Sequence, residues 1–325
     1  MDTLTQAFAA VQGWIFEVAV QPVIFDLGLM AYVEDAHQAV ATVMIGVIEI
    51  GALCLLFKPL EKWRPVEQWQ ERKAIRSDVI YTWLHRLGVL PLVIFLVLVI
   101  PVNEFDAWLR MHDMVRPNIE DLIPGMARNG FAAFLIYIMM FDFVEYWLHR
   151  WQHRFNWWWA LHSLHHSQRQ MSFWTDDRNH LLDDVLTSAA VALAALAIGV
   201  PSEQFILIII GTRMIESLSH VNARVHFGWA GERLLVSPRF HRRHHAIGVG
   251  HEGQYQGCNF AVLFPLWDIL FRTADFTPGY PPTGIRDQLV GRDYGIGFWR
   301  QQILGLVRLK NAMIPAGREP SRPAV

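Results

Sequence analysis

Eight of the fifteen histidines in this 325-residue chain stand in three short clusters. They are His149-Arg-Trp-Gln-His153, His162-Ser-Leu-His165-His166 and His241-Arg-Arg-His244-His245. Residues four apart lie on one face of a helix, so each cluster can direct two imidazoles toward one point. Neutral imidazole is the side chain that most often binds metal ions in proteins. The three clusters therefore predict a metal site.

Eight imidazoles are too many for a single ion, because a structural zinc takes four ligands and a catalytic zinc about three. They fit two ions that keep open coordination positions. Imidazole suits zinc, copper, iron and nickel alike, so the ligand type does not select the metal. The two cysteines, Cys54 and Cys258, form no CxxC pair, which argues against an iron–sulfur cluster or a closed structural zinc site. A zinc protease would need HExxH, but Arg150 follows His149.

Isolated histidines are more often surface or hydrogen-bonded residues than metal ligands. We therefore expect no metal role for His37, His85, His112 and His251, and we favour the same interpretation for His226.

The elements that hold the clusters are predicted to be membrane helices. The chain is 53% hydrophobic and 18% charged, against about 25% charged in a typical soluble domain. About 20 apolar residues cross a bilayer. Residues 8–32 are apolar but interrupted, and predict an interfacial helix or a poor span. Stronger runs occupy residues 38–57, 87–102 (extended back through Ile80), 130–144, and a hairpin of 185–202 with 205–212.

Charge predicts the orientation of these runs. The loop 58–76 carries six Lys and Arg residues, whereas the loop 103–129 carries three against five acids. The positive-inside rule places the first loop in the cytoplasm. Counting spans from there puts all three histidine clusters on the cytoplasmic face, if the helix of the third run continues through His149. The net charge of −2 and the lack of a basic, aromatic-interleaved stretch argue against nucleic acid as a partner.

Side chains near the clusters could orient the ligands, since ligating histidines usually donate their second N–H to a carboxylate or carbonyl. Asp142 is the leading candidate, because it lies seven residues before His149 on the same helix face. Asp183 and Asp268 are among the other candidate acids. Tryptophans around the first two clusters predict that the site lies near the level of the lipid headgroups.

The residues around the clusters resemble the fatty acid hydroxylase/sterol desaturase superfamily. The matching stretches run from Asp142 to Ser167 and from Ser237 to His245, followed by Asn259 to Thr273, so the resemblance covers about 130 residues. His220, in Ser219-His220-Val-Asn222, also resembles a family position. His180 does so less well, because Leu181 and Leu182 follow it where the family has Pro and Glu.

The resemblance implies ten metal ligands and no catalytic side chain beyond them. The implied ligands are His149, His153, His162, His165, His166, His180, His220, His241, His244 and His245. The implied fold is all-α: a polytopic membrane helix bundle with a cytoplasmic helical cap that holds a histidine-rich dimetal site. Residues 1–129 would form N-terminal membrane helices and loops, 130–275 the catalytic domain and 276–325 a C-terminal tail with a surface helix.

The implied chemistry is oxidation of a C–H bond in a membrane lipid by two iron ions with O₂ as co-substrate, with zinc as a second candidate for the metal in isolated protein. The sequence shows no haem-binding segment, dinucleotide-binding glycine motif or cysteine cluster. An external electron donor of the reductase, ferredoxin or cytochrome type is therefore expected.

Three alternatives remain open at this point. The same scaffold could desaturate its lipid or act on a headgroup instead of a chain. The chain could bind or store metal in the membrane without turnover. The histidines could also be inert parts of a membrane scaffold.

Overall fold

The computed structural model describes residues 2–114, 123, 129–200, 202–251 and 256–314. Within these residues the chain is helical, and its one extended pairing is an isolated bridge between Ala246 and Thr283. The helices are α1 (Asp2–Ile15), α2 (Gln21–Asp26), α3 (Val33–Trp63), α4 (Arg72–Arg86), α5 (Val89–Met111), α7 (Gly130–Arg154), α8 (Asn156–His166), α9 (Leu181–Ile198), α10 (Ser202–Ser219), α11 (Gly228–Leu234), α12 (Pro238–His244), α13 (Leu266–Leu270) and α14 (Phe298–Met313). The all-α prediction is confirmed.

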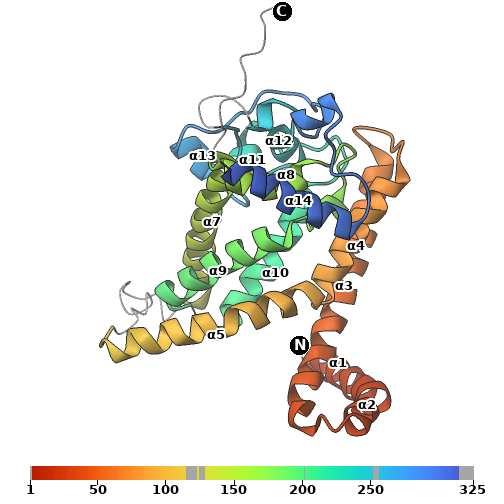
Figure 1. Ribbon diagram of the computed structural model, residues 1–325, viewed down its shortest axis with the longest axis vertical. Coiled ribbons are helices and arrows are strands. Elements are labelled where there is room, and N and C mark those ends of the chain that lie inside the picture. Colours follow the sequence, from red (N-terminus) through yellow and green to blue (C-terminus); the bar gives the residue numbers. More distant parts are fainter. Residues whose placement is uncertain (1, 115–122, 124–128, 201, 252–255, 315–325) are drawn as a thin grey trace, which may run out of the picture.

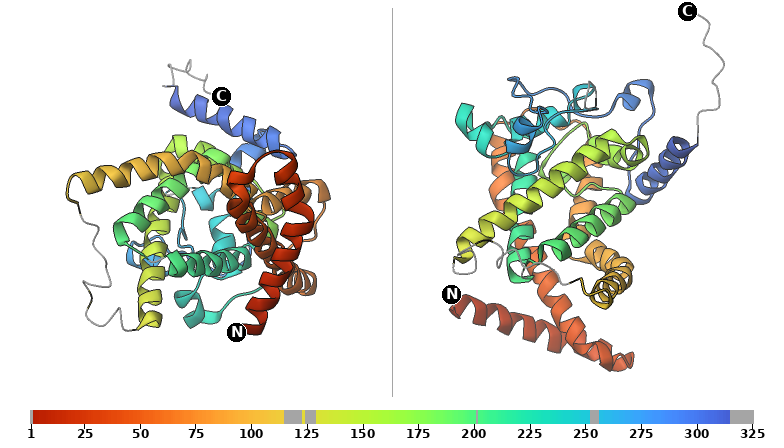
Figure 2. Two further views of the ribbon diagram at one scale, coloured as in Figure 1. Left: turned by 90° about the horizontal axis from the view of Figure 1, so that it is seen from below. Right: turned by 90° about the vertical axis from the view of Figure 1, so that its left-hand side faces the viewer.

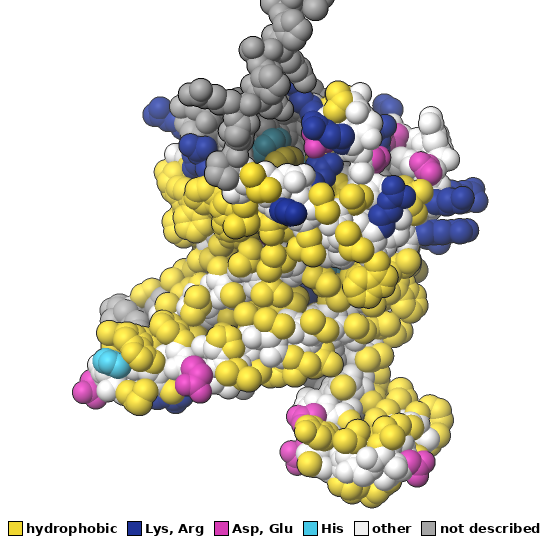
Figure 3. All heavy atoms as spheres, in the orientation of Figure 1, with side chains coloured by type: hydrophobic (Ala, Val, Ile, Leu, Met, Phe, Trp, Pro, Cys, Tyr) yellow, Lys and Arg dark blue, Asp and Glu magenta, His cyan; other side chains and the backbone are white. Residues whose placement is uncertain are grey.

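Five helical segments are long and apolar enough to cross a membrane. They are Thr3–Asp26, Met30–Trp63, Val89–Met111, Gly130–Arg154 and Leu181–Ile198. Hydrophobic side chains cover much of the lower part of the molecule in Figure 3, whereas Lys and Arg gather on its upper part. This separation confirms the predicted combination of a membrane helix bundle with a more polar cap.

The third apolar run continues as predicted. Helix α7 extends past the apolar residues to Arg154, so one rigid element carries both His149 and His153. The hairpin is also present as α9 and α10, with Gly199 between them in the left-handed conformation that ends many helices. Among the described residues α10 is not one of the five candidate spans, in keeping with its short apolar stretch.

The predicted extension of the second run back through Ile80 is wrong. Helix α4 ends at Arg86, and α5 begins only at Val89. Gly88 between them has a φ of +80°, a left-handed conformation that costs glycine little and breaks the helix. The break lets α5 run crosswise to α3 (Figure 1).

Short helices and loops gather around the end of α7 that carries the histidines, and we call this part, residues 155–180 and 220–314, the cap (Figure 1). Helix α14 lies along its outside (Figure 2). The sequence predicted a surface helix in a C-terminal tail, but in the structure one face of this helix is buried. Phe298, Gln301 and Gln302 are buried, and Phe298 contacts the ring of Tyr81 with 4.8 Å between centroids. Residues 315–325 lie outside the described part of the chain.

A buried arginine joins the cap to the membrane helices. Arg86 at the end of α4 donates to Asp177 Oδ2 (3.1 Å) and Asp176 Oδ2 (3.0 Å) in the cap and to Glu49 Oε2 (3.4 Å) in α3. Buried charges of this kind are stable only when they are paired. Arg86 therefore fixes the position of the segment that follows α8, next to the histidines.

Candidate metal centre

Nine of the ten predicted ligands meet at one place in the structure. They form two groups in which one side-chain nitrogen from each residue lies within 4.8 Å of the others, and all nine residues are buried. The five-histidine group is His149, His153, His162, His166 and His244. The four-histidine group is His165, His220, His241 and His245. The two groups adjoin, because the rings of His166 and His245 stack with 4.3 Å between centroids.

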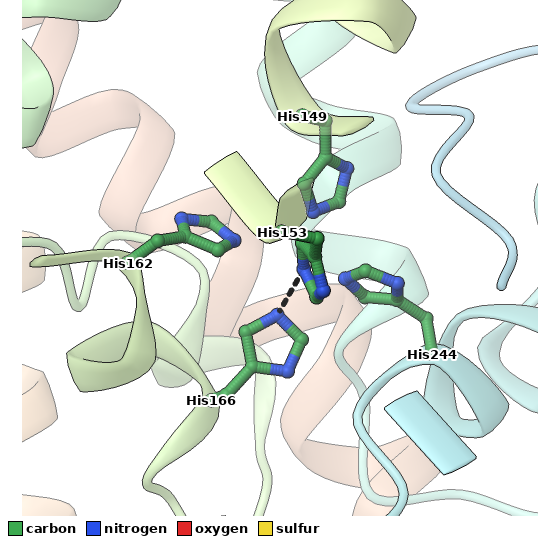
Figure 4. A group of neighbouring side chains, drawn as sticks. All are labelled: His149, His153, His162, His166 and His244. Carbon is green, nitrogen blue, oxygen red and sulfur yellow. Dashed lines mark hydrogen bonds between the residues drawn. The ribbon is translucent and has the colours of Figure 1, made fainter. Parts of the chain in front are cut away.

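Three helices supply the five-histidine group. His149 and His153 come from successive turns of α7, His162 and His166 from successive turns of α8, and His244 from α12. Figure 4 shows the five rings converging on a common point. His153 Nε2 lies 3.1 Å from His166 Nε2 at the centre of the group.

The four-histidine group has the same construction. His220 Nε2 lies 3.2 Å from His165 Nε2 and 3.0 Å from His241 Nε2, and His245 Nε2 lies 3.1 Å from His241 Nε2. His220 is the residue that follows α10, so the end of the hairpin contributes directly to the site.

In each of the two HxxHH clusters, the middle histidine belongs to a different group from the other two histidines. In α8, His162 and His166 join the five-histidine group and His165 joins the other. In the third cluster, His241 of α12 and His245, the residue after this helix, join the four-histidine group, whereas His244 joins the five-histidine group. Each short helix thus contributes to both groups and fixes the separation between them.

The ring nitrogens around the five-histidine group are arranged as in a metal site. His149 Nδ1 lies 2.8 Å from the Phe260 carbonyl oxygen and His244 Nδ1 lies 2.8 Å from that of Cys258. A carbonyl oxygen only accepts, so each Nδ1 carries the proton and each Nε2 has a free lone pair. The Nε2 atoms of His149, His162 and His244 are buried without a hydrogen-bond partner. Buried polar atoms are rarely left unsatisfied, and a bound cation would satisfy all three.

Burial also keeps the imidazoles in the neutral form that binds metal. It lowers the pKa of His220 to about 4. For five further histidines of the cap, burial and then repulsion between neighbouring imidazolium groups lower the pKa well below the usual 6.5; they are His165, His166, His241, His244 and His245. The donor set therefore fits a pair of transition-metal ions such as iron, and the role of these residues as ligands stays a prediction.

Asp183 in α9 is the carboxylate that orients a histidine of the site. It accepts from His162 Nδ1 (3.1 Å), Trp158 Nε1 (2.6 Å) and Gln152 Nε2 (2.9 Å), and it is 2% exposed. Asp176 approaches the four-histidine group from the other side, with its Oδ1 3.6 Å from His220 Nδ1. Asp183 belongs to the candidate span α9, and Asp176 accepts from Arg86, which also bonds Glu49 of α3, so the bundle and the site depend on each other.

The prediction that Asp142 orients His149 is wrong. Asp142 instead accepts from the backbone N–H groups of Leu263 (2.7 Å) and Phe264 (3.1 Å) and from Trp267 Nε1 (2.8 Å). Asp268 accepts from the N–H groups of Phe260 and Ala261 at 2.9 and 2.8 Å. The two acids hold the loop whose Phe260 carbonyl bonds His149, so they act on the ligand through the backbone.

His180 lies apart from both groups. Its Nε2 lies 2.9 Å from the Gln302 carbonyl oxygen in α14, and its Nδ1 accepts from the N–H of Leu182 at 3.1 Å as a cap of α9. Both ring nitrogens are therefore used in holding α9 to α14. His226 is exposed and accepts from the N–H of Gly228, as the sequence led us to expect.

His251, which the sequence gave no reason to select, lies beside the five-histidine group. Its ring stacks on Trp159 with 3.7 Å between centroids and 3° between planes, and its centroid is 5.7 Å from that of His153. It stands alone in the sequence, without a second histidine at helical spacing, so no pattern could have identified it.

A cavity of about 160 Å³, here called the site cavity, touches both groups. Its walls include His149, His162, His165, His220 and His241. Most of the other lining residues are polar: Glu145, Gln152, Asp176, Asn179, Asp183, Asp184, Thr187, Glu216 and Ser219. Burial, together with repulsion from Asp176, raises the pKa of Glu216 above its usual range. The cavity thus gives small molecules access to both groups at once.

A second hollow, the apolar groove, lies between α7 and α9, with Trp267 of α13 also lining it. It encloses about 750 Å³ and is lined wholly by hydrophobic residues: Leu135, Ile136, Met139, Met140, Phe143, Val144, Ala194, Ala197, Ile198 and Trp267. Residues three or four apart share a helix face. Val144 in the groove and Leu148 in the site cavity therefore lie on the same face of α7, which runs from one hollow to the other.

The part of the chain that carries the histidines is similar to known proteins. Residues 134–273 match the family model described as fatty acid hydroxylase. The chain is 27% identical over 148 residues to the ornithine lipid hydroxylase OlsE of Rhizobium tropici and 25% identical over 145 residues to methylsterol monooxygenase 1-3 of Arabidopsis thaliana. It is 27% identical over 135 residues to the human alkylglycerol monooxygenase.

These matches are partial. They cover 46%, 44% and 41% of this chain, and 43%, 47% and 28% of the respective relatives. The chain thus spans less than half the length of each of these relatives. No solved structure matches the chain. The matched region contains all three histidine clusters and confirms the resemblance drawn from them.

Proposed function

We propose that this chain is a member of the fatty acid hydroxylase/sterol desaturase superfamily, as its similarity over residues 134–273 supports, and that it is a di-iron oxygenase that uses O₂ to hydroxylate a membrane lipid. The observation that carries the proposal is the pair of adjoining groups of buried histidines with one cavity touching both. A storage site would need metal ligands but no cavity that reaches two ions together.

The proposed ligands are the nine histidines of the two groups, and His180 is left out because its two ring nitrogens have other partners. Two iron ions bound there would supply the reduction of O₂ and the cleavage of the C–H bond. The chain itself orients the imidazoles through Asp183 and the carbonyl groups of Phe260 and Cys258. These contacts fix the tautomer and direction of each ring.

The apolar groove supports a lipid as substrate. A hydrocarbon chain in the groove between α7 and α9 would be surrounded by hydrophobic side chains, and its far end would meet the site cavity at Leu148. Three relatives are named for an ornithine lipid, a methylsterol and an alkylglycerol, which are all largely apolar molecules. We infer that this chain acts on a substrate of the same general kind.

Residues 130–275 would form the catalytic domain, with residues 1–129 supplying the N-terminal membrane helices. Residues 276–314 contribute α14, which packs on the cap. We place the cap in the cytoplasm, because residues 58–76, which run from the end of α3 to the start of α4, carry six Lys and Arg against three Glu. Electrons would come from a separate donor on that side.

The proposal can be tested by comparing the lipids of cells that make the wild-type chain with those of cells that make the His153→Ala/His241→Ala variant, grown in air. We expect a lipid with one added oxygen atom in the wild type only, and about two iron ions per purified chain. A product that has lost two hydrogen atoms would establish desaturation instead. Bound metal without any change in the lipids would favour storage, and a metal-free chain would refute the proposal.

A further inference from the structure

A stacked pair of aromatic rings connects the five-histidine group to the surface of the cap. Trp159 lies with its ring centroid 4.9 Å from that of His153 and 5.2 Å from that of His166. On its other side it stacks on His251, with 3.7 Å between centroids. Trp159 and His251 are both partly exposed, whereas His153 and His166 are buried. The rings therefore form a continuous path from solvent to the candidate ligands.

This path opens into a pocket of about 110 Å³ on the cap, here called the surface pocket. Trp159, His251 and His166 line it together with Gly284, Ile285 and Arg308 among others. His166 does not line the site cavity, whereas His149 and His162 of the same five-histidine group do. The five-histidine group is thus approached from two sides, by the site cavity and by the surface pocket.

The surroundings of the surface pocket are basic. Its lining residues include two arginines, Arg286 and Arg308, and one acidic residue, Asp287. Arg292 pairs with the same Asp287, and the exposed Arg169 lies beside Gly284 at the rim. The site cavity differs in charge, since several of its walls are acidic. Among the described residues in and beside the pocket, four arginines stand against one aspartate, which pairs with Arg292 and Arg308. This excess gives the pocket a positive potential that attracts an acidic surface.

The wider cap carries the same sign of charge. The cap, residues 155–180 and 220–314, contains thirteen Lys and Arg against eight Asp and Glu, although the whole chain has a net charge of −2. Basic side chains gather on the upper part of the molecule in Figure 3. A macromolecule that docks here would meet a field that favours negative charge and speeds association.

We propose that this surface pocket is the entry point for electrons: an acidic one-electron carrier protein docks over it, and Trp159 with His251 conducts the electrons to the five-histidine group. The inference rests on the proposed function. Inserting one atom of O₂ into a C–H bond and releasing the other as water consumes two electrons and two protons. A one-electron carrier must therefore dock twice in each turnover, and it never enters the acidic, membrane-side cavity used by the lipid.

Docking can be measured without metal or turnover. The probe is a plant-type [2Fe–2S] ferredoxin, an acidic one-electron carrier, added to the full-length metal-free chain in nanodiscs. We expect binding that weakens as salt is raised, and a loss of affinity of at least tenfold in the Arg169→Gln/Arg308→Gln variant. Arg110→Gln is the matched control, since Arg110 is exposed on α5 and away from the cap. Equal affinity in both variants, or no binding at all, would overturn the docking surface.

The electron path is tested by the anaerobic reduction rate of the oxidised iron-loaded chain, followed by stopped-flow spectroscopy. Trp159→Leu and His251→Leu should slow reduction by ferredoxin at least tenfold while dithionite, a small reductant that needs no docking surface, reduces them at the wild-type rate. Trp159→Phe keeps an aromatic ring and should retain most of the rate. Trp157→Leu is the control, because Trp157 is 39% exposed on the same helix and stacks on Trp158 instead.

The outcomes separate the two proposals. If dithionite supports lipid oxidation but Trp159→Leu is reduced by ferredoxin as fast as the wild type, the oxygenase stands and the electron path is refuted. The same conclusion follows if both reductants slow equally with unchanged iron content. If the chain binds no iron, the proposed function fails, and the electron path fails with it.

Discussion

The Asp183→Asn substitution tests the construction of the site most directly. Asp183 accepts three hydrogen bonds, from His162, Trp158 and Gln152. An asparagine of the same size offers one acceptor oxygen and an NH₂ group that can only donate. At least one of the three donors is then left buried without a partner, and His162 is no longer held with its Nε2 toward the other four rings.

The magnitude follows from this loss. Leaving a buried donor unsatisfied costs about 1–3 kcal/mol, and about 1.4 kcal/mol corresponds to a factor of ten in affinity. We therefore expect the affinity of the five-histidine group for metal to fall roughly 5- to 150-fold. Removal of a side chain that orients a metal ligand lowers metal affinity by about 10- to 100-fold in other proteins. The four-histidine group shares no hydrogen bond with Asp183, so its affinity should fall less than that of the five-histidine group, which it adjoins.

The assay is a chelator-competition titration of the purified chain with Fe(II) or Zn(II), combined with elemental analysis. The variant should hold about one tightly bound ion where the wild type holds two. Asp184→Asn is the matched control, because Asp184 is the adjacent residue of α9 but pairs with His85, with 3.3 Å between them. Two tightly bound ions in Asp183→Asn, or the same loss in Asp184→Asn, would show that the orientation of His162 does not depend on this carboxylate.

Three further predictions concern other parts of the site. His180→Ala should leave the metal content unchanged in elemental analysis, because the ring bonds Gln302 in place of a metal; a loss of one ion would restore it as a ligand. Gly250→Ala should lower metal affinity at least tenfold in the same titration, since a Cβ there would lie 1.9 Å from the carbonyl oxygen of His244, and wild-type affinity would contradict this close packing. The metal-free chain should lose stability as pH falls from about 6.5 toward 4, because burial lowers the pKa of His220 to about 4 and the unfolded chain binds the proton first. Thermal unfolding followed by tryptophan fluorescence at several pH values checks this, and a melting temperature independent of pH would refute it.

The sequence determined the chemistry of the site, because the information is local. Spacings of four residues put His149 and His153 on one face of α7, and His162 and His166 on one face of α8, whatever the rest of the fold. The length of the apolar runs was equally local, so membrane helices were predictable at residues 38–57 and 130–144, where candidate spans are found.

Local periodicity misled where it was used to infer contacts. Asp142 and His149 share a face of α7, but seven residues correspond to about 10 Å along a helix, too far for a hydrogen bond. The partners of both residues come instead from the loop near residues 260–267, which is more than a hundred residues away in sequence. Similarly, the break at Gly88 depends on one residue's backbone conformation, and hydrophobicity does not reveal it.

Tertiary structure alone decided how the histidines divide. In an HxxHH cluster, the second and third histidines lie three and four residues after the first, so both lie on nearly the same helix face as the first. Helix geometry alone does not predict which metal group each of them joins. That choice is made by the packing of α8 against α7 and α12, which sends His165 to one group and His244 to the other. The packing of the cap also places His251 and Trp159 beside the site. It directs His180 away from the two groups and into a hydrogen bond with Gln302 of α14. The sequence by itself determined which side chains could bind metal, and the long-range packing of the cap decided which of them meet.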